Sequence, residues 1–160
     1  MNDDEKLRYA IARSEIHELA ARFSDAAIRN DPEAFGALWT EDGVWELGLP
    51  YPNKSEGVPA IVSFYQAQWK RWAWFVELTH SGVVEFESEN TARCRWIMRE
   101  MAGSADGKSS HDTLVMYDDS VIRGSDGIWR FSKRTYNSIW RSDSPLVGRS
   151  FSFPQFRKSI

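Results

Sequence analysis

Residues 92–100 read Ala-Arg-Cys-Arg-Trp-Ile-Met-Arg-Glu, and this alternation of apolar and charged side chains is typical of a β-strand. Apolar residues occupy the even positions, namely Ala92, Cys94, Trp96 and Met98. Because successive side chains of a strand point to opposite faces, the even face is predicted to be the inner one. Glu100 falls on that face, where a carboxyl group must be paired or have a raised pKa. The alternative is that the alternation fails at the strand end and that Glu100 is solvated.

The strand pattern continues on both sides of this stretch. We expect strands over residues 75–87, 91–101, 111–123 and 128–140, and a shorter strand over 44–47. Residues 48–57 contain two glycines and two prolines, which predicts a loop. The tight turn expected at residues 124–127 makes the last two strands a hairpin, so the second half of the chain is predicted to form antiparallel strands.

The first half of the chain follows the helical period instead. One apolar stripe runs along a predicted helix over residues 5–29, formed by Ile16, Leu19, Ala20, Phe23 and Ala27. Asp31 and Pro32 are a typical N-cap and first residue of a second helix over 32–39, and a third is predicted over 58–71. Helices followed by antiparallel strands indicate the α+β class, and 160 residues suit one domain over 1–160.

Composition narrows the possible functions. The net charge is −3 and no basic stripe is present, which argues against a nucleic-acid groove. No apolar run reaches the roughly 18 residues of a membrane span, and the acidic, polar start of the chain does not fit a secretory signal. Three histidines and the lone Cys94 lack the spacing of metal ligands, so neither a metal nor another cofactor is expected. These features predict a cytoplasmic protein that does not bind membranes.

Four short motifs occur in an order that suggests a family. They are Leu-Trp-Thr-Glu-Asp-Gly-Val-Trp at 38–45, Gly-Val-Pro-Ala-Ile at 57–61, Thr-His-Ser-Gly at 79–82 and Asp-Gly-Ile-Trp-Arg-Phe-Ser-Lys-Arg at 126–134. Over roughly residues 10–140 the chain resembles the SnoaL-like proteins of the nuclear transport factor 2-like superfamily. The resemblance implies a curved antiparallel sheet wrapped on three N-terminal helices, which together form a cone with one deep apolar pocket.

The resemblance also implies catalytic positions. The motifs match best the branch of scytalone dehydratase and hexachlorocyclohexane dehydrochlorinase, and this branch places a catalytic histidine at His80 and an arginine at Arg134. Its catalytic aspartate corresponds to Ile28, so the usual aspartate–histidine dyad cannot form here. We expect Glu100 to replace that aspartate as the partner of His80, whose imidazole titrates in the range that acid–base catalysis needs.

Two further polar side chains are catalytic candidates by strand parity. Arg134 and Tyr136 are predicted on one face of the last strand, opposite Trp129 and Phe131. A buried arginine can stabilise oxyanion charge, or it can form a structural ion pair with Glu100 or Asp119. Tyr117 can donate a hydrogen bond to a substrate oxygen. His111 has the same parity as Tyr117 and either lines the pocket mouth or lies in solvent beside the turn at 103–110.

Aromatic residues make up 14% of the chain, and eight of them are tryptophans. This abundance fits a wall for a flat ligand or plain core packing. The substrate-binding candidates are Trp45, Leu47, Tyr51, Phe75, Trp96, Met98, His111 and Tyr136, with Tyr51 placed to close over a ligand from the loop at 48–57.

The function that these features favour is a cofactor-independent lyase acting on a small aromatic or polycyclic, oxygenated compound. An isomerase or a polyketide cyclase would use the same parts. The rival is a non-catalytic ligand-binding module or an oxygenase small subunit, which Ile28 favours and the inward Glu100 and Arg134 oppose.

Assembly is predicted from the outer face of the 91–101 strand. Arg93, Arg95, Ile97 and Arg99 lie on that face, through which relatives commonly pair, so we expect a homodimer or homotrimer. A solvated basic strand is the alternative. Residues 142–160 form a tail that is a lid, a partner contact or a frayed end.

Overall fold

The computed structural model of the chain describes residues 2–142, 144–149 and 151, and it confirms the α+β class. The elements in chain order are α1 (Asp3–Arg29), α2 (Pro32–Gly36), β1 (Trp39–Leu47), β2 (Asn53–Glu56), α3 (Val58–Trp69), β3 (Trp74–Phe86), β4 (Thr91–Gly103), β5 (Ser110–Arg123) and β6 (Trp129–Arg141). The predicted role of the 142–160 tail lies largely outside the described residues. Within its described part, the backbone N–H of Leu146 donates to Ser110 Oγ at 2.9 Å.

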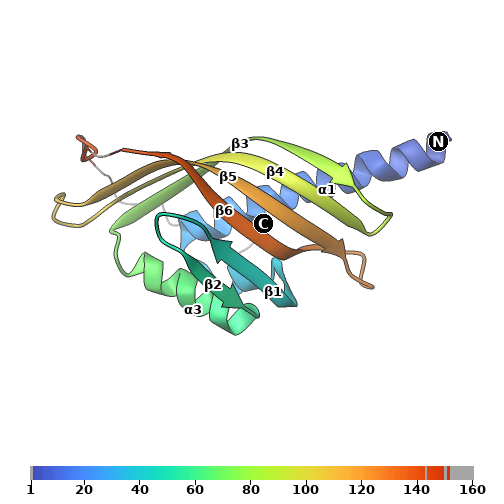
Figure 1. The fold of residues 1–160 in the computed structure, drawn as a ribbon, viewed down its shortest axis with the longest axis horizontal. Helices are drawn as coiled ribbons and strands as arrows, with labels where there is room; N and C mark the ends of the chain where they lie inside the picture. The colour runs from blue at the N-terminus through green and yellow to red at the C-terminus, as the bar shows by residue number, and fades with distance from the viewer. Residues whose placement is uncertain (1, 143, 150, 152–160) are drawn as a thin grey trace.

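The six strands form one curved sheet in the order β2-β1-β6-β5-β4-β3. The long strands β3 to β6 arch over α1, whereas β1, β2 and α3 form a second group at the other edge (Figure 1). All neighbouring strands are antiparallel except β1 and β6, which are parallel. The antiparallel strands predicted for the second half of the chain, β3 to β6, are confirmed, and the parallel pair joins β6 to β1 of the first half. β1 and β6 are separated by most of the chain, so no short turn imposes an antiparallel direction on them.

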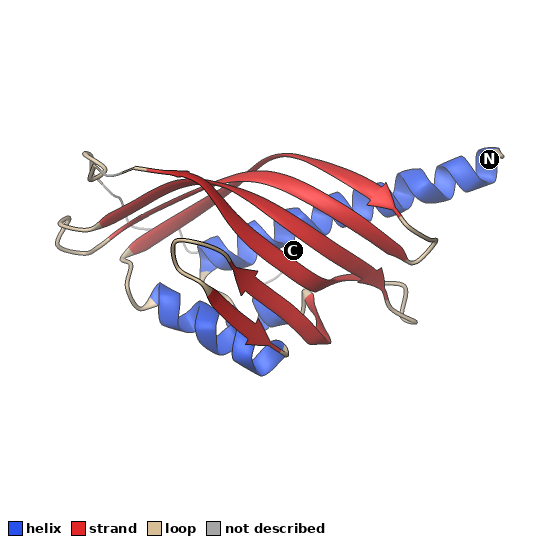
Figure 2. Cartoon of the chain, viewed as in Figure 1, coloured by secondary structure: helices blue, strands red, loops and turns tan. Residues whose placement is uncertain are grey.

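Several element boundaries in the first half also differ from the prediction (Figure 2). The second helix ends at Gly36 instead of residue 39, because Trp39 already pairs with Phe131 of β6. Part of the predicted loop at 48–57 is the strand β2, where Ser55 lies opposite Trp45. In both places pairing with a distant strand overrides the local pattern. The predicted N-cap is confirmed, since the Asp31 side chain accepts from the backbone N–H of Ala34 at 3.0 Å.

The hydrophobic core lies between α1 and the concave face of the sheet. Phe23 stands at its centre, within 6.3 Å of the ring centroids of Phe35, Trp39, Trp45, Tyr117 and Phe131. The parity predicted for β4 is confirmed, because Cys94, Trp96, Met98 and Glu100 are all buried whereas Arg93 and Arg95 are exposed. Trp96 lies flat against Gly82, where a Cβ atom would stand 2.0 Å from its ring.

Two β-bulges change which side chains face the core. In β3, Thr79 and Ser81 lie opposite the consecutive residues Met98 and Ile97, which leaves His80 as the extra residue. In β6, Ser132 is the extra residue between Phe131 and Lys133. An extra residue reverses the alternation beyond it, so residues of opposite parity come to share one face.

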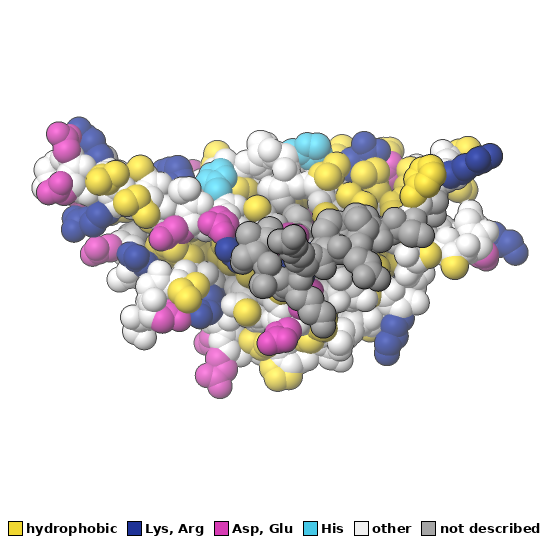
Figure 3. Space-filling view, turned by 180° about the vertical axis from the view of Figure 1, so that it is seen from behind, with side chains coloured by type: hydrophobic (Ala, Val, Ile, Leu, Met, Phe, Trp, Pro, Cys, Tyr) yellow, Lys and Arg dark blue, Asp and Glu magenta, His cyan; other side chains and the backbone are white. Residues whose placement is uncertain are grey.

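The surface away from the sheet is uneven in character. Charged side chains of both signs lie on the projecting N-terminal part of α1 beside the exposed Leu7 and Ile11, and the opposite end of the molecule carries both hydrophobic and basic side chains (Figure 3). None of the helices in the described part of the chain is long and apolar enough to cross a membrane.

Candidate active site

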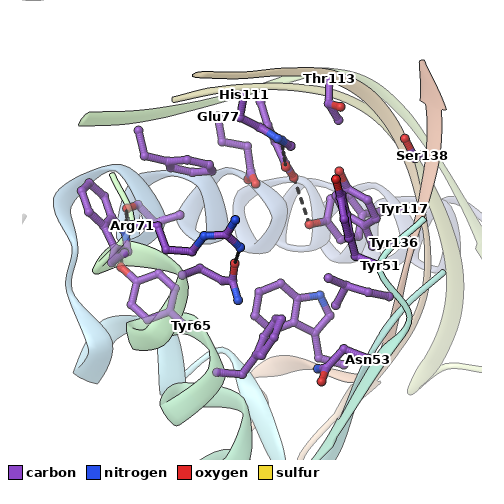
Figure 4. Close-up of a pocket in the computed structure, with 18 of the residues that line it drawn as sticks. Tyr51, Asn53, Tyr65, Arg71, Glu77, His111, Thr113, Tyr117, Tyr136 and Ser138 are labelled. Carbon is purple, nitrogen blue, oxygen red and sulfur yellow. Dashed lines mark hydrogen bonds and ion pairs between the residues drawn. The ribbon is translucent and has the colours of Figure 1, made fainter. Parts of the chain in front are cut away.

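A cavity of about 510 Å³ lies between the concave face of the sheet and the helices. Side chains from α1, α2, α3 and all six strands line it, and most of them are aromatic or aliphatic (Figure 4). The cavity occupies the place where the resemblance implied a pocket. Eight predicted site residues line it, namely Trp45, Leu47, Tyr51, Phe75, Glu100, His111, Tyr117 and Tyr136. His80, Trp96, Met98 and Arg134 do not.

Glu100 is the centre of a hydrogen-bonded group at this cavity. Its Oε1 accepts from the hydroxyl of Tyr117 at 3.3 Å, and its Oε2 lies 3.3 Å from Nε2 of His111. The prediction that Glu100 points inward is confirmed, since only 7% of the residue is exposed. His111 lies at the cavity and not in solvent, with 17% of its side chain exposed.

Tyr117 is a donor that keeps its proton. Burial raises the pKa of its phenol well above the usual range, and the charges of Glu100 and Glu77 raise it further. A phenol with a raised pKa stays neutral at physiological pH, so its O–H can donate to Glu100 or to a ligand oxygen.

His80 lies outside the cavity, and the prediction that it faces the pocket is wrong. Its side chain is exposed because His80 is the extra residue of the β3 bulge. Without the bulge, the parity of Gly82 and Val84 would have carried His80 to the inner face. The predicted contact between His80 and Glu100 is replaced by the contact between His111 and Glu100.

Arg134 is buried behind the cavity wall and does not line it. Its Nε donates to Asp119 Oδ1 at 3.1 Å, and both side chains are 0% exposed. Its guanidinium carbon lies 3.9 Å from the ring centroid of Phe23, 4.0 Å from that of Tyr117 and 4.4 Å from that of Phe131. Two roles were predicted for Arg134, the stabilisation of oxyanion charge and a structural ion pair. The contacts favour the structural ion pair with Asp119. Arg134 therefore positions the Tyr117 ring from behind.

The β6 bulge explains how Arg134 reaches this place. Trp129, Phe131, Arg134 and Tyr136 all point to the concave side, so the predicted opposition of the first two to the last two is wrong. The extra residue Ser132 shifts the alternation by one position.

Trp96 and Met98 are core residues and not cavity walls. Both are at most 2% exposed and lie farther along β4, where α1 covers the sheet. The ring of Trp96 makes an edge contact with His17 of α1 at 4.9 Å between centroids. Met98 Sδ lies 3.8 Å from the guanidinium of Arg134.

Glu77, which the strand pattern did not single out, lines the cavity from β3. Only 3% of Glu77 is exposed, and it lies directly opposite Glu100 in the strand register. Ser24 Oγ of α1 donates to its Oε1 at 2.8 Å. Burial raises the pKa of Glu77 to about 8, and the charge of Glu100 contributes. A glutamate within the apolar run at 75–78 is visible in the sequence. Because of the bulge at His80, however, strand parity does not predict the face of the sheet on which Glu77 lies.

Two arginines stand at the rim of the cavity. Arg141 Nη1 donates to the hydroxyl of Tyr51 at 2.7 Å, which holds the loop residue over the opening. The guanidinium of Arg71 reaches toward the side-chain oxygen of Gln68, 3.5 Å away (Figure 4). The described residues include no carboxylate partner for either guanidinium. The rim thus offers hydrogen-bond donors, whereas Glu77 and Glu100 make the interior acidic.

The chemistry available at this cavity is therefore proton transfer by carboxyl, imidazole and phenol groups. Within the part of the chain that the structure describes, no three His, Cys, Asp or Glu side chains are grouped as metal ligands.

Comparison with known proteins points to one family and one fold. A family model described as a SnoaL-like domain matches residues 8–135. A hexachlorocyclohexane dehydrochlorinase, LinA type 2, has a TM-score of 0.80 at 18% identity, with 94% of this chain and 99% of that chain covered. The LinA-type3 enzyme from Novosphingobium barchaimii has a TM-score of 0.78 at 20% identity, with 93% and 99% covered.

A candidate scytalone dehydratase from Novosphingobium aromaticivorans is similar to the same degree. Its TM-score is 0.78 at 18% identity, with 91% of this chain and 99% of that chain covered. No curated protein matches the chain. At these identities the likeness shows the shared fold, and the activity must be argued from the cavity.

Proposed function

Because the chain belongs to the SnoaL-like domain family, we propose that it is a cofactor-independent lyase that removes water from a small aromatic or polycyclic, oxygenated compound. Two of the similar structures are named for eliminations, a dehydrochlorinase and a candidate dehydratase, which supports this class of reaction. The single observation that carries the proposal is the buried Glu100, hydrogen-bonded to Tyr117 and in contact with His111 at the aromatic cavity.

Each member of this group has a chemical role in an elimination. The Glu100 carboxylate is the general base that takes a proton from a substrate carbon. The Tyr117 hydroxyl donates a hydrogen bond to the oxygen on which charge develops, and it does so in a site shielded from water. His111 contacts the carboxylate from the side opposite Tyr117 and holds its orientation.

The walls and the rim indicate the kind of substrate. Trp45, Phe75 and Tyr136 offer aromatic surface against which a flat ring can pack. A cavity of about 510 Å³ is within the usual range for a small-molecule site. Arg71 and Arg141 at the rim suit oxygen-bearing substituents at the outer end of the molecule.

A substrate panel tests the proposal. The protein is incubated, with a metal chelator present, with bicyclic aromatic compounds that carry a hydroxyl group β to an acidic C–H bond. We expect loss of one water from at least one compound, measured by mass spectrometry and by the absorbance of the new conjugated double bond. A product of unchanged mass would indicate an isomerase, and unchanged ligands that nevertheless raise the melting temperature would indicate a binding module.

We also infer that the chain assembles as a homodimer or homotrimer through the outer face of the sheet. Arg93, Arg95 and Arg99 on that face are paired with Asp118, Glu85 and Asp112 at 2.9–3.0 Å, which lowers the cost of covering them. The exposed side chains of Leu78 and Val83 add apolar surface beside these pairs. Sedimentation velocity at micromolar concentration is expected to show two or three chains per particle, and a monomer alone would contradict the inference.

A further inference from the structure

We propose that Glu77 and Glu100 form a catalytic carboxyl pair that holds one proton, with Glu77 as the general acid that protonates the departing hydroxyl group. The pair rests on the proposed lyase function and adds to it a second catalytic residue. Both members of the pair lie on strands. The pair takes the place of the aspartate–histidine dyad between a helix and a strand, which Ile28 makes impossible.

The strand register brings the two carboxyl groups together. Glu77 of β3 and Glu100 of β4 are direct cross-strand partners on the concave face, and both line the cavity. Side chains opposite each other in an antiparallel pair have Cβ atoms about 4.5–5.5 Å apart, and like charges there repel. Glu77 and Glu100 are only 3% and 7% exposed, so water screens this repulsion little. Sharing one proton removes one of the two charges.

The groups around Glu77 leave that proton in place. Ser24 Oγ of α1 donates to its Oε1 at 2.8 Å, and the Ser24 hydroxyl is 2.9 Å from that of Thr79. The hydrogen bond from Ser24 lowers the pKa of Glu77, but burial and the charge of Glu100 raise it by more. The charge of Arg134 on β6 opposes protonation of Glu77, but this guanidinium is already bound to Asp119 of β5. One arginine therefore acts on two buried carboxyl groups, those of Asp119 and Glu77, and it does not neutralise both.

The groups around Glu100 favour the charged carboxylate instead. Tyr117 of β5 donates to one of its oxygens, and Nε2 of His111 contacts the other. Tyr136 of β6 lines the same wall, and burial raises its pKa, so its phenol is neutral. Hydrogen-bond partners stabilise an anion, and among the described residues Glu100 has two of them against the single hydroxyl of Ser24 at Glu77, so the negative charge of the pair stays on Glu100 and the proton on Glu77.

The direction of the pKa shift agrees with this division of roles. Burial raises the pKa of Glu77 to about 8, the charge of Glu100 adds to the rise, and hydrogen bonding to Glu100 does so as well. Glu77 is therefore the protonated member of the pair at neutral pH and is available as an acid.

An elimination by this pair balances in atoms and electrons. Glu100 takes a proton from the substrate carbon, and the electrons of that C–H bond form the new C=C bond. The C–O bond breaks toward oxygen, and Glu77 gives its proton to the leaving hydroxyl, which departs as water. The proton on Glu100 then moves to Glu77 and restores the pair. Because both carboxyl groups project from one face of the sheet, proton and hydroxyl leave from the same face of the substrate.

Infrared spectroscopy of the free protein tests the shared proton without any substrate. We expect wild-type protein at pH 7 to show the C=O stretching band of a protonated carboxylic acid, and this band should disappear as the pH rises through about 8. Burial also raises the pKa of Asp119 to about 7, so Asp119 contributes to the same band. The band should therefore be weaker in Glu77→Gln than in wild type, and unchanged in the control Glu89→Gln, which changes an exposed glutamate of the β3–β4 turn. A wild-type spectrum without the band, or a band of equal strength in wild type and Glu77→Gln, would overturn the pair.

Stability against pH gives a second readout. A folded-state pKa of about 8, above the ordinary 4.5, means that the folded protein keeps a proton which the unfolded chain releases. Stability should therefore fall as the pH rises between about 5 and 8. Glu77→Gln removes this contribution, so its urea midpoint should rise relative to wild type over the same window. If the urea midpoint of Glu77→Gln differs from that of wild type by the same amount at pH 5 and at pH 8, Glu77 does not hold the proton.

Kinetic measurements test the Glu77–Glu100 pair independently of the proposed lyase function. With a substrate from the panel, Glu77→Gln should lower kcat by about 10²- to 10⁴-fold with little change in KM. It should also lose the fall in wild-type activity above pH 8, where Glu77 ionises. Full activity in Glu77→Gln together with inactivity in Glu100→Gln would refute the pair and leave the lyase function standing. Full activity in both variants would refute the pair and the role of Glu100 as the base, whereas the lyase function itself is refuted if the wild-type protein dehydrates no compound of the panel.

Discussion

Replacing Arg134 with leucine should lower the free energy of unfolding by about 3–5 kcal/mol, as is usual when one partner of a buried ion pair is removed. The substitution leaves the carboxylate of Asp119 at 0% exposure without its cation. It also removes a guanidinium packed within 4.4 Å of three aromatic ring centroids. Urea unfolding followed by tryptophan fluorescence measures the loss.

A matched control separates this effect from the loss of any arginine on β6. Arg130 pairs with Asp126 at 2.8 Å near the surface, and Arg130→Leu should change the free energy of unfolding by about 1 kcal/mol or less. The double variant Arg134→Leu/Asp119→Leu should recover part of the loss, because it leaves no unpaired charge. A loss below about 1 kcal/mol in Arg134→Leu would show that Asp119 is not held by this arginine.

The second large effect is expected for Glu100→Gln, which should lower kcat by about 10²- to 10⁴-fold. The variant keeps the size of the side chain and its contacts with Tyr117 and His111, but an amide cannot accept a proton from carbon. Binding is little affected, so KM should change far less than kcat. Steady-state kinetics on the substrate that the panel identifies measures both values.

Two controls accompany this experiment. Glu89→Gln changes a glutamate that is exposed and far from the cavity lining, and it should leave kcat unchanged. The melting temperature of Glu100→Gln should stay near that of wild type, since an amide of the same size keeps the contacts with Tyr117 and His111. Activity of Glu100→Gln within a few-fold of wild type would show that another group is the base.

The cavity unites residues that lie far apart in the chain. Glu77, Glu100, His111 and Tyr117 come from three consecutive strands, and their side chains meet because the register aligns β3 with β4 and β4 with β5. The acid–base groups thus belong to one rigid wall of the sheet. The opposite wall, from α3, carries aromatic side chains such as Tyr65, which can hold a substrate against the carboxyl groups (Figure 4).

Local periodicity in the sequence was enough to predict several features of this protein. The helical stripe of residues 5–29, the N-cap at Asp31 and the alternation of residues 92–100 each depend on neighbours within a few positions. The inward direction of Glu100 belongs to this group, because β4 has no bulge between Ala92 and Glu100 relative to β5. The motif order likewise indicated the family that matches residues 8–135.

Only the tertiary structure decided which other side chains reach the cavity. The bulge at His80 turns that residue outward and Glu77 inward, and the bulge at Ser132 turns Arg134 inward. A bulge arises from how two strands align over their full length, so the local sequence of one strand does not reveal it. Trp96 and Met98 were correctly placed on the inner face, yet α1 covers them. Periodicity determines the face of a strand on which a side chain lies, whereas the packing of distant elements determines whether that face meets a cavity or the core.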